Sequence, residues 1–287
     1  VSTKISNHSA SLGYLAAQGC QALRGVSASP RLDAEVLLAH TAGISRSVVF
    51  AFSERTIRPE MECRYFDLIA KRVNGMLVAQ LVGKKEFYSL EFVVTADTLV
   101  PRPETELLVE KALAWIPEKA KMSILDIGTG TGAIALAIKK HRPHACITGV
   151  DVSEAALFVA KGNGVALDLD VRWLRSSAYS ALSGERFDLI VTNPPYVEKG
   201  DPCLLDDICF EPRLALDGGT DGLDIIRVIV AGAKKHLSPN GRLLMEHGLD
   251  QSGVVTKLLQ ANSLEVLGSY CDLARHPRAL GAQVVTP

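Results

Sequence analysis

The spacing of apolar side chains divides the chain into two parts. Through the first 80 residues, apolar positions recur three and four apart, as at Leu12 and Leu15, which predicts amphipathic helices. Pro30 and Pro59 suit first helical turns, where a missing N–H costs nothing. No catalytic constellation falls in this part of the sequence. We therefore expect residues 1–80 to form a small helical domain that recognises the substrate or serves as a packing module.

A short alternating stretch separates this helical part from the rest of the chain. Residues 86–94 alternate between polar and apolar side chains, which predicts a β-hairpin inside a linker that we place at residues 81–101. The proline-containing run 101–106 then leads into a helix that carries Leu107. The second domain is expected over residues 102–287.

From about residue 121, strand-like runs alternate with helical ones, which predicts an α/β domain with a parallel sheet. Seven strands with a late pair unseparated by a helix fit a Rossmann-like class I methyltransferase sheet better than a six-stranded dinucleotide fold. The strands are predicted at 122–127, 145–151, 170–175, 187–192, 241–247, 264–270 and 282–286, and the helices at 131–141, 154–164, 222–237 and 250–261.

Composition narrows the possible partners. The net charge of −1 argues against a protein held on nucleic acid by bulk electrostatics, so we expect no stable nucleic-acid partner. No apolar run approaches membrane-spanning length and no early segment reads as a leader, so we expect a cytoplasmic protein. The cysteines form no Cys-x-x-Cys pair and have no nearby His cluster, which predicts free thiols and no metal site. They are Cys20, Cys63, Cys146, Cys203, Cys209 and Cys271.

A glycine-rich loop follows the first strand of this domain, between Asp126 and Gly132. Glycines there let the backbone adopt positive φ and pass close to a ligand. Asp126 precedes the first glycine by two residues and can hold a cationic amino group or order the loop. Asp151 ends the next strand and can accept both hydroxyls of a ribose. The loop alone also satisfies the dinucleotide fingerprint, and this acid suits NAD equally, so the two features leave both cofactors open.

The tetrapeptide Asn193-Pro194-Pro195-Tyr196 distinguishes between the two kinds of cofactor that the glycine loop leaves open. Its prolines cannot donate ladder hydrogen bonds, so the strand ends there and exposes the Asn193 side chain and the Pro194 carbonyl at the C-terminal edge of the sheet. Two carbonyl oxygens aimed at one point can accept both hydrogens of a planar –NH2 group, with Tyr196 flat against it. Hydride transfer has no use for such a clamp. Although the tetrapeptide alone can be a rigid turn, its register with the glycine loop indicates methylation of a nitrogen.

These motifs and several others resemble the protein-(glutamine-N5) methyltransferases that modify peptide chain release factors. The resemblance covers nearly the full chain and implies a helical N-terminal domain, a hairpin and an S-adenosylmethionine-binding domain. It also implies that the substrate is the glutamine of the Gly-Gly-Gln tip of class I release factors. The supporting segments are Gly83-x-x-Glu86-Phe87, Val100 to Glu106, Asp126 to Gly132, Asn193 to Tyr196, Glu211-Pro212, Gly218 with Asp221-Gly222, Glu246-His247-Gly248 and Asp272-Leu273-Ala274.

The resemblance assigns roles to individual positions. The glycine loop would line the methionine part of the cofactor, and Asp151 would hold its ribose. Where the family often has an acid and an aromatic for the adenine, this chain has Ser177-Ala178; Ser177 can still hydrogen-bond there, and Tyr179 can still pack. The implied cofactor-binding residues are Asp126, Gly128, Thr129, Gly130, Thr131, Gly132, Asp151, Ser177, Ala178 and Asn193.

The acceptor site is implied at the same edge of the sheet. Asn193, Pro194 and Tyr196 are the predicted catalytic residues. Arg102 and Glu104 either cap a helix or shape the pocket. Glu246-His247 suits core support and substrate contact equally, so we leave it out of the catalytic set. The predicted substrate-binding residues are Asn193, Pro194, Pro195, Tyr196, Arg102 and Glu104.

Other functions remain as alternatives at this stage. Adenine-N6 and guanine-N2 nucleic-acid methyltransferases also present such a loop to an exocyclic amine, but they usually add a basic recognition region. A glutamine methyltransferase of a ribosomal protein is a closer alternative, although the stretch Pro101 to Glu106 matches the release-factor version. An NAD-dependent oxidoreductase and a cofactor-binding module without catalysis belong to other classes. We expect the protein to be a monomer.

Overall fold

The computed structural model describes residues 10–205 and 210–285, and these divide into two compact units. The first unit runs up to Gly83 and includes Phe210, and the second begins at Lys84. Each unit has its own hydrophobic core.

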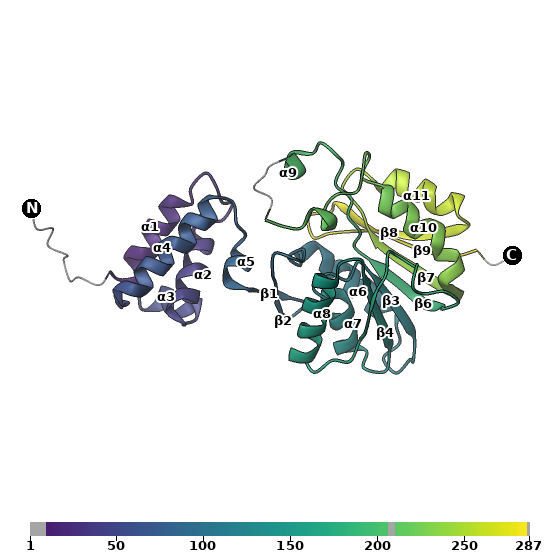
Figure 1. The fold of residues 1–287 in the computed structure, drawn as a ribbon, viewed down its shortest axis with the longest axis horizontal. Helices are drawn as coiled ribbons and strands as arrows, with labels where there is room; N and C mark the ends of the chain where they lie inside the picture. The colour runs from purple at the N-terminus through teal and green to yellow at the C-terminus, as the bar shows by residue number, and fades with distance from the viewer. Residues whose placement is uncertain (1–9, 206–209, 286–287) are drawn as a thin grey trace, which may run out of the picture. The chain divides into compact units, whose positions relative to one another are not determined.

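Within the described residues, the first unit consists of helices (Figure 1). Its core includes Leu15, Leu38 and Tyr65, and the Tyr65 hydroxyl donates a hydrogen bond to the carbonyl oxygen of Leu15 at 3.2 Å. Pro30 and Pro59 occupy first turns, as their spacing predicts. The helices are α1 (Leu12–Ala22), α2 (Pro30–Ala42), α3 (Arg46–Ala51), α4 (Pro59–Val73) and α5 (Val78–Val82).

A two-stranded hairpin opens the second unit, with β1 (Lys84–Phe87) paired to β2 (Leu90–Val93). Tyr88 and Ser89 both adopt positive φ, which gives the turn the twist that a two-residue hairpin needs. The buried amide of Asn163 exchanges two hydrogen bonds with the backbone of Val93, at 2.8 and 3.1 Å, and so fixes the hairpin to the second unit.

Seven strands of the described chain form one sheet in the order β5-β4-β3-β6-β7-β9-β8. Strands β5, β4, β3, β6 and β7 are parallel, and β9 is antiparallel to both of its neighbours. This confirms the seven-stranded α/β prediction. The bounds are β3 (Ser123–Ile127), β4 (Cys146–Asp151), β5 (Arg172–Arg175), β6 (Phe187–Thr192), β7 (Leu237–Glu246), β8 (Leu264–Cys271) and β9 (Pro277–Val284).

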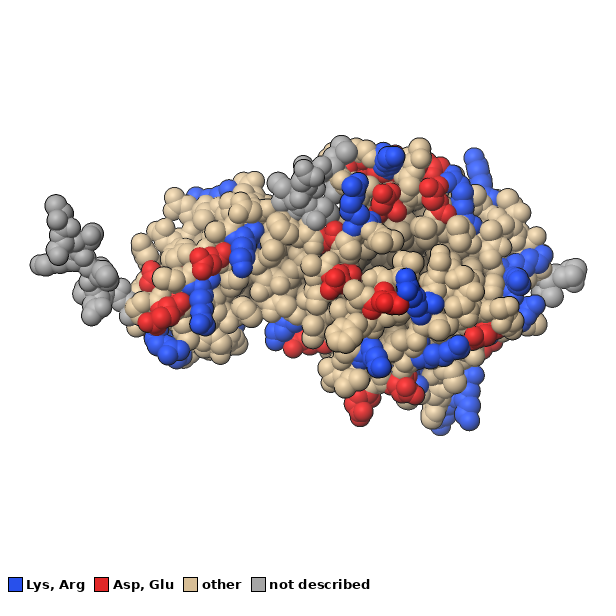
Figure 2. Space-filling model, in the orientation of Figure 1, with Lys and Arg blue, Asp and Glu red and all other residues tan. Residues whose placement is uncertain are grey.

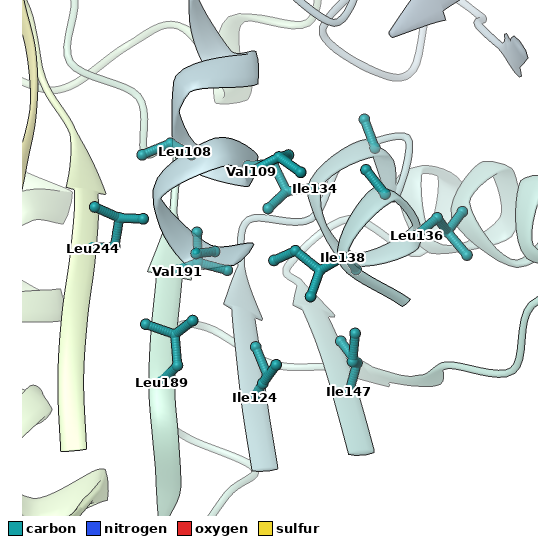
Figure 3. Packing of buried hydrophobic residues seen from close by; sticks show 14 of the residues in the cluster. Leu108, Val109, Ile124, Ile134, Leu136, Ile138, Ile147, Leu189, Val191 and Leu244 are labelled. Atoms are coloured by element: carbon teal, nitrogen blue, oxygen red, sulfur yellow. The ribbon is translucent and has the colours of Figure 1, made fainter. Parts of the chain in front are cut away.

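Helices cover both faces of this sheet. One core cluster packs α6 and α7 against β3, β4 and β6 (Figure 3), and the other packs α10 and α11 against the opposite face. Parallel strands β3, β4, β6 and β7 all end at the same edge, and the loops that follow them lie there. The helices are α6 (Glu106–Trp115), α7 (Ala133–His141), α8 (Glu154–Ala166), α9 (Pro202–Leu205), α10 (Asp224–His236) and α11 (Ser252–Ala261), with 3₁₀ turns at Pro103–Thr105 and Arg213–Ala215.

Two strands begin four or five residues before their predicted starts, and the other described boundaries lie within two residues of the prediction. Strand β9 begins at Pro277 instead of residue 282, because Ala279 to Ala282 are buried between two antiparallel neighbours and show no alternation in the sequence. Residue 286, which the prediction included, lies outside the described residues. Strand β7 begins at Leu237 instead of residue 241, and a bulge opposite Phe187 accommodates Pro239 and Asn240.

Candidate active site

The glycine loop joins the end of β3 to the start of α7 with three glycines at positive φ. Gly128, Gly130 and Gly132 have φ of 72°, 55° and 80°. Apart from its two chain neighbours, no described residue has an atom within 4 Å of a Cβ built on Gly130, whereas a Cβ on Gly132 would lie 2.9 Å from Cη2 of Trp173. Gly130 therefore leaves open space along the loop for a ligand, and Gly132 permits close packing of α7.

Asp126 lies beneath this loop and is fully buried. Its Oδ2 accepts a hydrogen bond of 2.6 Å from the Thr129 hydroxyl, so the acid orders the loop. Among the described residues, nothing donates a hydrogen bond to its Oδ1. Burial raises the pKa of the Asp126 carboxyl to about 7. A buried oxygen without a donor is an acceptor that a bound cationic group can use.

Asp151, at the end of β4, is brought directly to the loop. One of its carboxylate oxygens accepts a 2.9 Å hydrogen bond from the Gly130 N–H, and the other accepts one of 2.9 Å from the Ser153 N–H. Each oxygen keeps a further lone pair. The loop and the acid that the sequence singled out therefore form one site.

The Asn193–Tyr196 segment adjoins the same loop. Strand β6 pairs Thr192 with Ile127 on β3, and the Thr192 hydroxyl donates to the Ile127 carbonyl at 2.8 Å. A Cβ on Gly128 would lie 4.0 Å from the backbone oxygen of Asn193. The structure therefore places the start of the tetrapeptide beside the glycine loop, at the C-terminal edge of the sheet.

The two oxygens of the predicted clamp are both available. Asn193 Nδ2 donates a 3.1 Å hydrogen bond to Thr105 Oγ1. Within residues 10–205 and 210–285, neither Asn193 Oδ1 nor the Pro194 carbonyl accepts a hydrogen bond. Pro194 is buried and Pro195 is half-buried. The segment thus offers one side-chain and one backbone acceptor.

Tyr196 is held by a buried carboxylate that the sequence did not assign to the site. Its hydroxyl donates to Glu246 Oε1 at 3.2 Å, and the Thr105 hydroxyl donates to Glu246 Oε2 at 2.8 Å. Burial raises the pKa of Glu246 to about 7, and burial also raises the pKa of the Tyr196 phenol. Glu246 is the last residue of β7. Its position at the end of a parallel strand is the sequence signal that could have assigned it to the site.

Two further residues, Gln251 and Gly222, support this edge. Gln251 Nε2 donates to the Tyr196 carbonyl at 3.0 Å, and Gln251 Oε1 accepts from the Gly248 N–H at 2.9 Å. A Cβ on Gly222 would lie 2.4 Å from the Tyr196 oxygen, so only glycine fits there. Gln251 carries no motif of its own in the sequence, and only the structure shows its role.

Arg102 and Glu104 lie outside the Asn193 network. Arg102 forms an ion pair with the buried Glu211, and the other Glu211 oxygen accepts a 2.9 Å hydrogen bond from the Val100 N–H. Glu104 is exposed at the 3₁₀ turn that precedes α6. In this structure, Glu211 therefore fixes the segment that carries both residues.

The Ser177-Ala178 position has local interactions. Ser177 is exposed and its N–H donates to Ser180 Oγ at 3.1 Å, while Ala178 has a φ of 46°. Tyr179, in contrast, is buried in the core, where its ring stacks on His236 with 4.3 Å between centroids and its hydroxyl bonds to Ile229 O. In this structure the Tyr179 ring therefore packs on His236 and not at the surface beside Ser177.

The residues present fit S-adenosylmethionine. The open space at Gly130 admits a ligand, the Asp126 oxygen accepts from an ammonium group, and Asp151 faces the same loop. In the described part of the chain, no group of three or more His, Cys, Asp or Glu is arranged to hold a metal. No helix described here has the length and apolar character to cross a membrane.

The seven-stranded order and the site at its edge define a class I S-adenosylmethionine-dependent methyltransferase. Residues 103–209 match the family model of the Methyltransferase small domain, and residues 15–83 match the PrmC N-terminal domain. The chain belongs to the release factor glutamine methyltransferase family.

This membership is shown by curated relatives. The release factor glutamine methyltransferase of Burkholderia pseudomallei is 45% identical over 262 residues, which cover 88% of this chain and 92% of the relative. That of Pseudomonas aeruginosa is 46% identical over 254 residues, with coverage of 88% and 92%. Among solved structures, a methyltransferase from Pyrococcus furiosus shares the fold, with a TM-score of 0.52, 17% identity and coverage of 75% of this chain and 96% of that one.

Proposed function

We propose that this protein transfers the methyl group of S-adenosylmethionine to the side-chain amide nitrogen of the glutamine in the Gly-Gly-Gln tip of class I peptide chain release factors. The relatives are named release factor glutamine methyltransferases. The observation that carries the chemistry is the arrangement of Asn193, whose backbone lies beside the glycine loop and whose Nδ2 donates to Thr105, so that Oδ1 has no hydrogen-bond partner among the described residues.

The proposal assigns a binding role to each part of the edge. The loop residues Gly128 to Gly132, with Thr129 and Thr131, bind the methionine part of the cofactor, and Asp126 accepts from its ammonium group. Asp151 holds the ribose hydroxyls, and Ser177 with Ala178 borders the adenine. Residues 1–80 recognise the body of the substrate, and residues 102–287 carry out the catalysis. Residues 81–101 link these two domains.

An amide nitrogen is a weak nucleophile because its lone pair is delocalised into the carbonyl. When bound, the cofactor supplies an activated sulfonium methyl, so catalysis requires positioning and electrostatics more than a base. Asn193 Oδ1 and the Pro194 oxygen accept the two N–H groups of the glutamine and favour the positive charge that grows on its nitrogen. Tyr196 packs against the amide plane. The proton leaves after transfer, because an N-protonated amide is strongly acidic.

Charge supports a protein substrate over a nucleic acid. The face shown in Figure 2 mixes Lys and Arg with Asp and Glu, without a broad area of one sign. Together with the net charge of −1, this argues against a nucleic-acid methyltransferase. We further propose that the protein acts as a monomer in the cytoplasm, where release factors are found.

The test is methyl transfer with labelled S-adenosylmethionine to a release factor and to its variant in which the tip glutamine is alanine. We expect label on the first and none on the second. Equal labelling of both would remove the glutamine as the target.

A further inference from the structure

Four polar side chains form a continuous hydrogen-bonded chain behind the acceptor site. Asn193 donates to Thr105, Thr105 donates to Glu246, and Tyr196 donates to the other Glu246 oxygen, at 3.1, 2.8 and 3.2 Å. Thr105 is 5% exposed and Glu246 is 2% exposed. The chain joins both clamp side chains, Asn193 and Tyr196, to one buried carboxylate.

The direction of these hydrogen bonds follows from counting protons. An ionised carboxylate can only accept, so Thr105 must give its single hydroxyl proton to Glu246. The Thr105 oxygen is then left as an acceptor, and the Asn193 atom that faces it must be the donor Nδ2. Asn193 Oδ1 consequently points away from Thr105 and stays free to accept from a substrate amide.

We propose that Thr105 and Glu246 are positioning residues, which set the orientation of the Asn193 amide and the Tyr196 ring for methyl transfer. This inference rests on the proposed function. Neither residue touches the reacting atoms. Their effect is to stop the Asn193 amide from rotating by half a turn, which would aim an –NH2 group at the substrate –NH2 group and prevent its binding.

The hydrogen-bonded chain Asn193–Thr105–Glu246–Tyr196, which we call the relay, depends on the charge of Glu246. Once protonated, Glu246 keeps fewer lone pairs, and Thr105 can direct its proton to Asn193 instead, which favours the wrong amide orientation. The groups that act on Glu246 are Thr105, Tyr196, the positive Arg278 and the negative Glu104, and burial raises its pKa to about 7. Burial lowers the pKa of His247, the next residue in the chain. We therefore expect kcat to fall as the pH drops below about 7.

Thr105→Val tests the relay because valine keeps the shape and removes the hydroxyl. We expect kcat to fall by about 10- to 100-fold, as for other residues that orient a site from behind, with S-adenosylmethionine affinity within about twofold. Thr105→Ser should restore kcat to within about threefold. The matched control is Thr98→Val, because the Thr98 hydroxyl is buried and has no hydrogen-bond partner in the described chain; its kcat should not change.

Two further measurements separate this inference from the proposed function. The side-chain NH2 signals of Asn193 in ¹⁵N NMR, identified by their loss in Asn193→Ala, should exchange slowly with water in the wild type and quickly in Thr105→Val, with no substrate present. Unchanged exchange would overturn the relay even in an active enzyme, whereas a wild type that labels no release factor would refute only the proposed function. If Thr105→Val does not fold, the pH dependence of kcat in Glu246→Gln provides the test. A kcat that no longer falls at acidic pH supports the relay, and a kcat that falls as it does in the wild type refutes it.

Discussion

The buried Asp126 makes a quantitative prediction about stability. Asp126→Asn keeps an oxygen for the Thr129 hydroxyl, which donates to Oδ2 at 2.6 Å, and removes a charge from a side chain that is fully buried. We expect the variant to be more stable than the wild type above neutral pH, although it lacks a group of the proposed cofactor site.

The magnitude follows from the shift in pKa. Burial raises the pKa of Asp126 from 3.8 to about 7, so the folded protein holds a proton that the unfolded chain has already released. The free energy of unfolding therefore falls as the pH rises from 3.8 to about 7. At about 1.4 kcal/mol per pKa unit, the wild type loses about 4 kcal/mol across this window through Asp126. The contribution is constant below and above the window.

The assay is urea denaturation of both proteins without cofactor, at a series of pH values from about 4 to 9. The difference in free energy of unfolding between the variant and the wild type should grow with pH and level off above about 7. Asp170→Asn, at an exposed aspartate, is the control and should shift stability by no more than about 0.5 kcal/mol. A difference between Asp126→Asn and the wild type that does not change with pH would refute the reasoning.

Three other substitutions test the packing around the site. Gly132→Ala places a Cβ 2.9 Å from Trp173 at a φ of 80°, so it should cost about 1–3 kcal/mol, and an unchanged melting temperature would contradict this. Glu211→Ala removes the partner of the partly exposed Arg102 and should cost about 2 kcal/mol in urea denaturation, with a smaller cost expected for Glu211→Gln. Asn163→Ala removes three hydrogen bonds made by a buried amide and should cost about 2–3 kcal/mol; hydrogen exchange in the hairpin should accelerate, and unaltered protection would show that the amide does not fix it.

Periodicity predicted the strands and helices that are buried in a regular way. The run 187–192 is a central strand in which every residue except the half-buried Asp188 is buried, and the sequence places it without error. Strand β9 was harder, because Pro277 and Arg278 at its start look like a loop. Pro277 belongs to the strand through its pairing with Cys271 of β8, and pairing with β7 begins at Ala279. Nonlocal pairing of this kind leaves no periodic signal.

The candidate active site also contains nonlocal contacts that the sequence alone does not predict. Gly128, Asp151 and Asn193 each follow a parallel strand, so the sequence alone predicts that they meet at one edge. Thr105 carries no such signal, because it lies in the turn before α6, 88 residues before Asn193. Glu246, 141 residues after Thr105, does end a parallel strand. For Tyr179, its place next to Ser177-Ala178 in the sequence does not show that its ring stacks on His236 in the core.

The most direct measurement of the amide clamp compares Asn193→Ala with the wild type in two assays. Calorimetry should give an S-adenosylmethionine affinity within about threefold of the wild type, while methyl transfer to a release factor should fall by at least about 100-fold, as when a preorganised polar group is removed from a reaction centre. Asn262→Ala, at the end of α11, is the control and should keep both values. Methyl transfer by Asn193→Ala within about tenfold of the wild type would show that the Asn193 oxygen does not hold the glutamine amide.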